Sequence, residues 1–152
     1  MERFLRTELL IGKEKVKQLR RAKVTVVGLG AVGSYVIEAL ARAGIGSLRL
    51  VDFDAVHCSN INRQLLALES TVGLKKTDCA RARIKDINPR CEVETAGLFA
   101  AEETVDELFS VEPDICVDAI DGVNPKVSLL AEAWQKNIPV ISSMGAALRT
   151  DP

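Results

Sequence analysis

Hydrophobic and polar positions divide this chain into two kinds of segment. Short runs rich in β-branched and apolar residues are typical of strands, and longer segments with apolar residues every three or four positions are typical of helices. The predicted strands are 23–27, 47–52, 91–96, 114–119 and 138–143. The predicted helices are 13–21, 31–43, 76–87, 102–109 and 125–136. The alternation of strand and helix is typical of βαβ units.

The apolar strands indicate how the sheet is arranged. Continuously apolar runs, such as Ile115 to Val117 and Val140 to Ile141, suit a parallel sheet covered on both faces. We therefore predict an α/β Rossmann-like fold of three layers with a mainly parallel sheet. In such folds the ligand binds at the carboxyl ends of the strands, where the strand order reverses. A nucleotide site is expected there.

The length and net charge of the chain limit the number of domains and the classes of protein that it can represent. The 152 residues, 47% of them hydrophobic, fit one domain spanning residues 1–152. A formal net charge of −1 argues against a protein that coats nucleic acid by bulk electrostatics. The segment from Lys13 to Lys23 is locally basic. We interpret it as a solvated amphipathic helix in preference to an RNA-contacting surface.

The cysteine pattern and the lack of a signal peptide bear on the cellular compartment of the protein. Four scattered cysteines without a CxxC pair, and no signal peptide or long apolar span, predict a cytoplasmic protein with free thiols and no membrane attachment. His57 and Cys58 are adjacent, so in extended structure their side chains point to opposite sides and do not form a catalytic dyad.

The chain stops after a strand-like run without a closing helix. We expect a domain truncated at its C-terminal end.

The strand-like run at 24–27 leads directly into the glycine loop Gly28-Leu29-Gly30-Ala31-Val32-Gly33. Gly28 suits a tight turn, Gly30 leaves room for a phosphate, and Gly33 allows a helix and a strand to pack closely. Ala31 would begin the helix, whose N-terminus attracts an anion. Asp52, at the end of the second strand, could accept hydrogen bonds from ribose hydroxyls. These residues predict a bound nucleotide, and they support NAD and ATP equally as candidates.

The residues that follow Asp52 favour ATP. Asn60 and Arg63 lie three residues apart, which on a helical turn places them on one face. An arginine can hold phosphate oxygens and stabilise the charge that develops at an α-phosphate. Lys76 opposes the dipole at a helix start, so it is more natural as a phosphate ligand. Asp121 could coordinate a magnesium ion carried by the triphosphate.

Six segments, in this order and spacing, resemble the adenylation domain of the ubiquitin-activating-enzyme superfamily, which includes activators of sulfur-carrier proteins. They are VVGLGAVGS, VDFD, SNINRQ, TVGLKK, INP and DAIDG. Three further features are similar to the superfamily members that cyclise and dehydrate threonylcarbamoyladenosine in tRNA. These are RFLRTELLIG near the start, Asn62, and MGAALRTDP at the end.

The resemblance implies an ATP-dependent activation of a carboxylate, with tRNA as the substrate. The carboxylate attacks the α-phosphate, pyrophosphate leaves, and an acyl-adenylate remains. ATP and Mg²⁺ are the implied cofactors, and the glycine loop, with Ala31, would surround the nucleotide. By similarity, Asp52 would hold the ribose, Asn60, Arg63 and Lys76 the phosphates, and Asp121 the Mg²⁺. Arg6 resembles an arginine that reaches the ATP of the partner subunit in homodimeric relatives.

Several alternatives stay open at this point. The activated carboxylate could belong to the C-terminus of a ubiquitin-like sulfur-carrier protein, with a cysteine desulfurase or a sulfur-carrier system as partner. An NAD-dependent oxidoreductase is supported by the glycine loop and Asp52 alone. A non-catalytic partner domain is opposed by the joint presence of Asp52, Arg63, Lys76 and Asp121. Relatives of the superfamily continue past this length, so turnover is expected to need further segments.

Overall fold

The computed structural model describes residues 2–101 and 103–145, and its centre is a sheet of five parallel strands in the order β3-β2-β1-β4-β5. The strands are β1 (Lys23–Val27), β2 (Ser47–Val51), β3 (Glu92–Ala96), β4 (Ile115–Asp118) and β5 (Val140–Ser142). The predicted Rossmann-like fold is confirmed. Most of the terminal segment MGAALRTDP, and the predicted helix start at position 102, lie outside the described residues.

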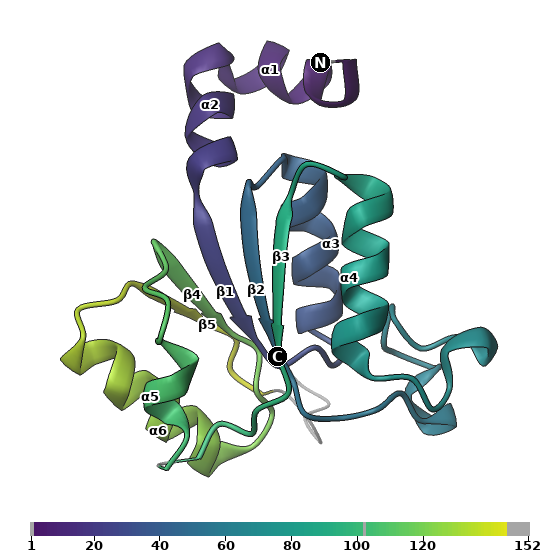
Figure 1. The fold of residues 1–152 in the computed structure, drawn as a ribbon, viewed down its shortest axis with the longest axis vertical. Coiled ribbons are helices and arrows are strands. Elements are labelled where there is room, and N and C mark those ends of the chain that lie inside the picture. The colour runs from purple at the N-terminus through teal and green to yellow at the C-terminus, as the bar shows by residue number, and fades with distance from the viewer. Residues whose placement is uncertain (1, 102, 146–152) are drawn as a thin grey trace, which may run out of the picture.

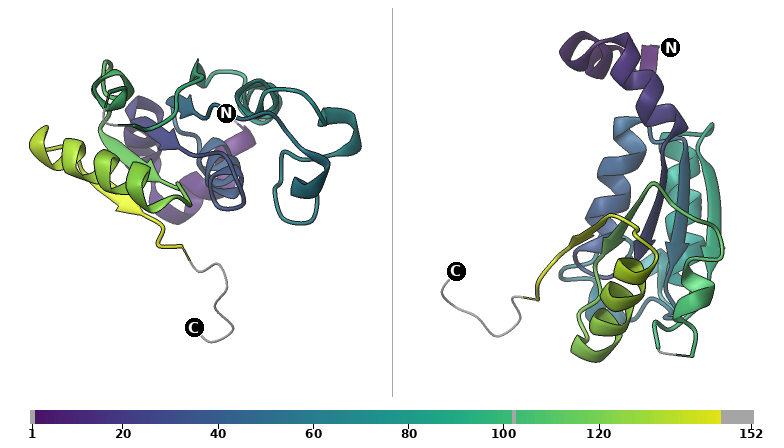
Figure 2. Two further views of the ribbon diagram at one scale, coloured as in Figure 1. Left: turned by 90° about the horizontal axis from the view of Figure 1, so that it is seen from below. Right: turned by 90° about the vertical axis from the view of Figure 1, so that its left-hand side faces the viewer.

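Helices cover both faces of the sheet, which gives the three predicted layers (Figures 1 and 2). One layer contains α3 and α4, and the opposite layer contains α5 and α6. The bounds are α3 (Gly33–Ala43), α4 (Lys76–Ile87), α5 (Val105–Leu108) and α6 (Val123–Gln135). The N-terminal elements η1 (Glu2–Phe4), α1 (Leu5–Ile11) and α2 (Lys13–Arg21) stand beyond the amino ends of the strands. Two short 3-10 turns, η2 (Cys58–Asn60) and η3 (Glu69–Thr71), lie between β2 and α4. No helix within 2–101 or 103–145 is long and apolar enough to cross a membrane.

Alternation along the central strands supplies two separate hydrophobic cores. Leu48 and Leu50 of β2 pack with the α3 and α4 side chains, whereas Val51 packs with α5 and α6. Leu48, Leu50 and Val51 are completely buried. Burial of each such side chain contributes about 1.5–3 kcal/mol, so the sheet is held firmly between its two helical layers.

The strand order reverses beside β1. Its neighbours are β2 on one side and β4 on the other, both parallel to it, with Val27 in register with Val51 and with Asp118. The loops that follow β1 and β4 therefore leave the sheet side by side, at the topological switch point. This is the edge at which the sequence predicts the nucleotide.

Two local expectations are corrected by the structure, and one helix was not expected. The helix after the glycine loop begins at Gly33, so Ala31 lies in the preceding turn, within the usual variation of helix ends. The expected covering of Val140 and Ile141 is wrong for Ile141, which is 59% exposed because β5 is an edge strand among the described strands. Helix α1 was not predicted, since its apolar side chains have no described core to bury against.

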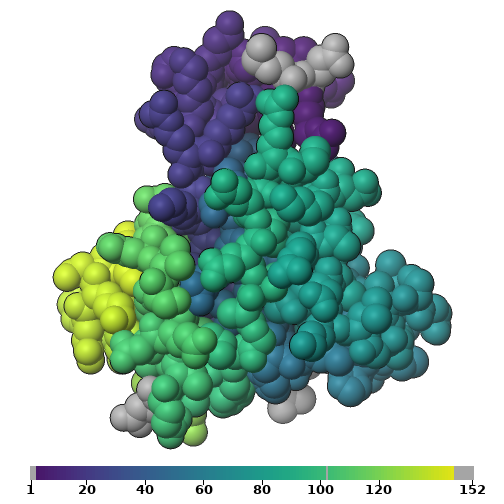
Figure 3. All heavy atoms as spheres, viewed as in Figure 1, coloured from purple at the N-terminus to yellow at the C-terminus, as the bar shows by residue number. Residues whose placement is uncertain are grey.

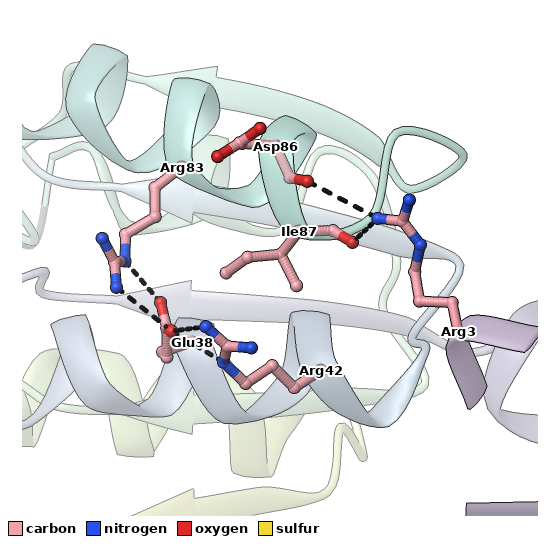
Figure 4. A network of polar contacts seen from close by, with 6 residues as sticks. All are labelled: Arg3, Glu38, Arg42, Arg83, Asp86 and Ile87. Atoms are coloured by element: carbon pink, nitrogen blue, oxygen red, sulfur yellow. Dashed lines mark hydrogen bonds and ion pairs between the residues drawn. The ribbon is translucent and has the colours of Figure 1, made fainter. Parts of the chain in front are cut away.

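A charged network ties α3 to α4. Glu38 of α3 accepts hydrogen bonds from Arg83 of α4, with Nη2 to Oε1 at 3.2 Å, and forms an ion pair with Arg42 at 2.6 Å (Figure 4). These arginines, Arg83 first, lower the pKa of Glu38 below its ordinary value although partial burial opposes them. At the end of α4, Arg3 donates to the carbonyl oxygen of Ile87. That bond fixes the N-terminal elements to the helical layer.

Candidate nucleotide site

Two glycines of the loop after β1 are required by close backbone contacts. A Cβ on Gly33 would lie 1.8 Å from the Gly28 carbonyl oxygen, so only glycine lets α3 start this close to the strand. Gly28 has a φ of +89°, and a Cβ there would lie 2.7 Å from the Ala119 carbonyl oxygen. A Cβ on Gly30 would meet only Gln64 Nε2, at 3.8 Å. The loop is thus tightly packed at its two ends and open at Gly30.

Asp52 holds the glycine loop in place. Its Oδ2 accepts a hydrogen bond from the Leu29 amide at 2.7 Å, and its Oδ1 accepts one from the Asp54 amide at 2.8 Å. The residue is 8% exposed. A carboxylate oxygen can accept more than one hydrogen bond, so these contacts leave capacity for a ribose hydroxyl. They also give Asp52 a structural role that the sequence does not reveal.

Lys76 is buried and paired with a carboxylate. The residue is 5% exposed, and its Nζ lies 2.7 Å from Oδ2 of Asp54. The two residues meet because the chain pairs back on itself, through an isolated antiparallel bridge between Ala55 and Lys75. Asp54 is a functional candidate that sequence reasoning did not single out, although it stands two residues after Asp52. An incoming phosphate would compete with Asp54 for the ammonium group.

Asn60 and Arg63 lie on one helical turn, as their spacing predicts, because the Arg63 amide donates to the Asn60 carbonyl oxygen at 3.1 Å, but their side chains differ in exposure. Asn60 is 8% exposed, and its Oδ1 accepts a hydrogen bond from the His57 amide at 3.0 Å, closing the 3-10 turn η2. Arg63 is exposed, and its Nη1 donates to the Ser59 carbonyl and to Asn62 Oδ1, each at 2.9 Å. Gln64, next in sequence, places this segment against the glycine loop at Gly30.

The loop after β4 contains Asp121 and, beneath it, a buried ion pair. Asp121 is exposed, with its Oδ1 3.4 Å from the position of a Cβ on Gly145. Asp118 is completely buried and accepts hydrogen bonds from Lys126 Nζ and Ser142 Oγ, both at 2.6 Å. Lys126 also donates to the Ser143 carbonyl oxygen at 2.9 Å. This pair joins β4, β5 and the first turn of α6, and sequence reasoning missed it.

A single feature could have indicated both buried lysines. Lys76 and Lys126 each stand in the first turn of a helix, where a positive charge opposes the dipole, and each pairs with an aspartate near a strand end. The sequence analysis used this argument for Lys76 and did not apply it to Lys126.

The remaining candidates lie apart from the loop. Arg6 is exposed on α1, at the end of the molecule opposite the carboxyl ends of the strands (Figure 1).

The four cysteines are free thiols, as predicted. Burial raises the pKa of Cys116 to about 12 and that of Cys91 to about 11, so both thiols stay protonated near neutral pH.

The ThiF family model matches residues 3–152, nearly the whole chain. The chain belongs to the ThiF family. Among its relatives, the tRNA threonylcarbamoyladenosine dehydratase of Bacillus subtilis is 49% identical over 152 residues, which is all of this chain and 60% of that protein. The molybdopterin-synthase adenylyltransferase of Haemophilus influenzae is 35% identical over 140 residues, 92% of this chain and 55% of that protein.

Solved structures agree with these relatives of the ThiF family. The crystal structure of Escherichia coli tRNA N6-threonylcarbamoyladenosine dehydratase in complex with ATP superposes with a TM-score of 0.95 at 40% identity. The match covers 99% of this chain and 62% of that one. The chain thus spans about three fifths of the length of these two dehydratases.

Proposed function

We propose that this ThiF-family protein uses ATP and Mg²⁺ to adenylate the carboxyl group of threonylcarbamoyladenosine in tRNA, and so drives its cyclisation. The observation that carries the proposal is the gathering of the glycine loop, Asp52, Lys76 and the Asp121 loop at one switch point, in a chain that is 49% identical to a dehydratase of this name. Full turnover is proposed for the complete protein.

The reaction divides into two steps. A carboxylate oxygen attacks the α-phosphorus of ATP, the bond to the β-phosphate oxygen breaks, and pyrophosphate leaves. A nitrogen of the same modified nucleoside then attacks the activated carbonyl carbon, loses its proton and expels AMP. The oxygen of the formally lost water leaves with AMP, so ATP is converted to AMP and pyrophosphate for each ring closed.

The candidate residues suit these steps. Asp52 would hold the ribose, Asn60, Lys76 and Arg63 the phosphates, and Asp121 the Mg²⁺, a cation usually bound by one or two carboxylates together with substrate phosphates. Arg63 would stabilise the charge on the pentavalent phosphorus, because its guanidinium presents several donors in one plane. Before ATP binds, Asp54 keeps the Lys76 ammonium paired and in position.

A homodimer completes this proposal. Helix α1 buries none of its residues, and Leu9 and Leu10 are 78% and 84% exposed. Arg6 on the same helix is at the far end from its own glycine loop (Figure 1). We propose that a second copy covers the apolar side chains of α1 and places its own nucleotide site near Arg6. The action of Arg6 on ATP is therefore expected between subunits.

The first experiment is a calorimetric titration of the full-length protein with ATP and Mg²⁺, beside an identical titration with NAD. We expect saturable ATP binding and no NAD signal. Asp121→Ala should weaken ATP binding at least tenfold in the presence of Mg²⁺. Asp86→Ala removes an exposed carboxylate at the opposite end of α4 and should bind ATP as the wild type does. Binding of NAD alone would contradict the proposal.

A further inference from the structure

A basic groove lies at the amino ends of the strands, the edge opposite the nucleotide site. Its volume is about 510 Å³, and it is bounded by the end of α2, the turn between α3 and β2, and the segment that follows α4. Figure 3 shows the surface hollowed between α2 and the teal segment after α4. The groove has the size of a ligand site but none of the candidate residues for ATP lines it.

The charge of the groove is one-sided. Five basic residues line it, against the single acid Glu92: Arg3, Arg20, Arg21, Lys23 and Arg90. The whole chain has a net charge of −1, so this concentration of positive charge is local. Arg20, Arg21, Lys23 and Arg90 are exposed, and no ion pair found within 2–101 and 103–145 engages them. These four side chains can therefore bind a polyanion without first breaking an ion pair.

The walls of the groove are rigidly placed. A Cβ on Gly46 would lie 1.8 Å from the Arg20 carbonyl oxygen, so α2 rests directly on the turn before β2. The Gly46 amide donates to the Leu19 carbonyl at 3.1 Å. On the other wall, the buried side chain of Asn88 donates to the Ile45 carbonyl at 3.1 Å and anchors the turn that carries Arg90. Arg3 is held by the Ile87 carbonyl oxygen (Figure 4).

We propose that this groove binds the sugar-phosphate backbone of the RNA substrate, away from the nucleotide that reacts. The proposal rests on the proposed function, because it supplies the polyanion. Phosphate contacts by Arg and Lys position a nucleic acid without selecting its sequence, and they bind structured RNA largely by shape. A five-residue parallel strand is about 16 Å long, which is short compared with the RNA helix of about 16 base pairs that one small RNA-binding domain can span. One RNA can therefore contact both ends of the sheet.

The test is binding of tRNA that carries threonylcarbamoyladenosine to the full-length protein, measured by fluorescence anisotropy between about 50 and 200 mM salt. Arg20→Gln/Arg90→Gln removes one charge from each wall. We expect an affinity for tRNA that is about tenfold lower. The slope of log affinity against log salt concentration should fall by the amount that corresponds to about one to two phosphate contacts. Lys13→Gln/Lys17→Gln is the matched control, because it removes two charges from the same helix outside the groove.

Two results would overturn the groove proposal. Equal losses of tRNA affinity in the groove and control variants would show that only bulk charge acts, and unchanged tRNA affinity in the groove variant would show that the groove is not used.

ATP titration of the same variants separates this proposal from the proposed function. If the wild type binds ATP and the groove variant binds tRNA unchanged, the groove proposal alone fails. If the wild type does not bind ATP, the proposed function fails, and the comparison of tRNA affinities still decides the groove.

Discussion

At the scale of single residues, the site depends on charges that are buried only because they are paired. Asp118 has no exposed surface, and Lys126 supplies the countercharge at 2.6 Å. Taking an ion out of water is costly, so one member of such a pair cannot be removed without penalty. The same reasoning applies, less strictly, to Lys76 and its half-buried partner Asp54.

Lys126→Met should destabilise the full-length protein by about 3–5 kcal/mol, because it leaves the Asp118 carboxylate buried without its cation. Urea unfolding followed by circular dichroism measures the loss. The double variant Asp118→Asn/Lys126→Met removes both charges and should recover a large part of it. A single variant as stable as the wild type would show that the pair does not hold β4, β5 and α6 together.

Sequence reasoning at this scale succeeded where local chemistry determines the role. The packing required of Gly28 and Gly33 follows from a strand, a turn and a helix start within twelve residues, and the backbone contacts confirm it. It failed for Asp54, Asp118 and Lys126, whose partners come from other elements. Spacing correctly placed Asn60 and Arg63 on one helical turn, but it could not show that Asn60 is buried and Arg63 exposed. Their roles toward ATP stay predictions.

At the scale of secondary-structure elements, hydrophobic periodicity located each strand that the structure describes and the helices of both layers. Amphipathic α3, and β1 and β2, which are buried after their first residues, follow directly from their patterns. Helix α1 was missed because its exposed leucines, such as Leu9 and Leu10, do not contribute to the described core. Strand β5 shows the same dependence on context, since Ile141 lies in an apolar run typical of a covered strand but is exposed at the edge of the described sheet.

The contact between α3 and α4 should depend on pH through Glu38. Its pKa is lower folded than unfolded, so its stabilisation is complete above the ordinary value of 4.5 and is lost as the pH falls through the folded pKa. Glu38→Gln should cost roughly 1 kcal/mol at pH 7, and the difference from the wild type should vanish in acid.

Thermal unfolding from pH 7 down to pH 3 measures this difference. Glu14→Gln is the control, because Glu14 pairs with Lys17 on the exposed surface of α2 and contributes far less. A difference between Glu38→Gln and the wild type that stays constant across this range would show that the Glu38 carboxylate does not stabilise the contact.

At the scale of the whole molecule, the sheet separates two functions by one strand length. The carboxyl ends carry the residues proposed for ATP, and the amino ends carry the basic groove proposed for the RNA backbone. Helix α1 projects from the amino end (Figure 1), and its Leu9 and Leu10 are exposed where a second copy is proposed to dock. The fold class could be predicted from this chain alone, whereas the groove could not, because it joins residues from four separate segments.

The most direct test is to incubate the full-length protein with ATP, Mg²⁺ and tRNA that carries threonylcarbamoyladenosine, and to analyse the nucleosides by mass spectrometry. We predict a nucleoside lighter by one water, formed with one AMP and one pyrophosphate per ring. Arg63→Ala should slow its formation by about 10² to 10³. Absence of the lighter nucleoside, or its formation without ATP, would contradict adenylation of this substrate, and a decrease of less than about threefold would contradict the role of Arg63 at the phosphate.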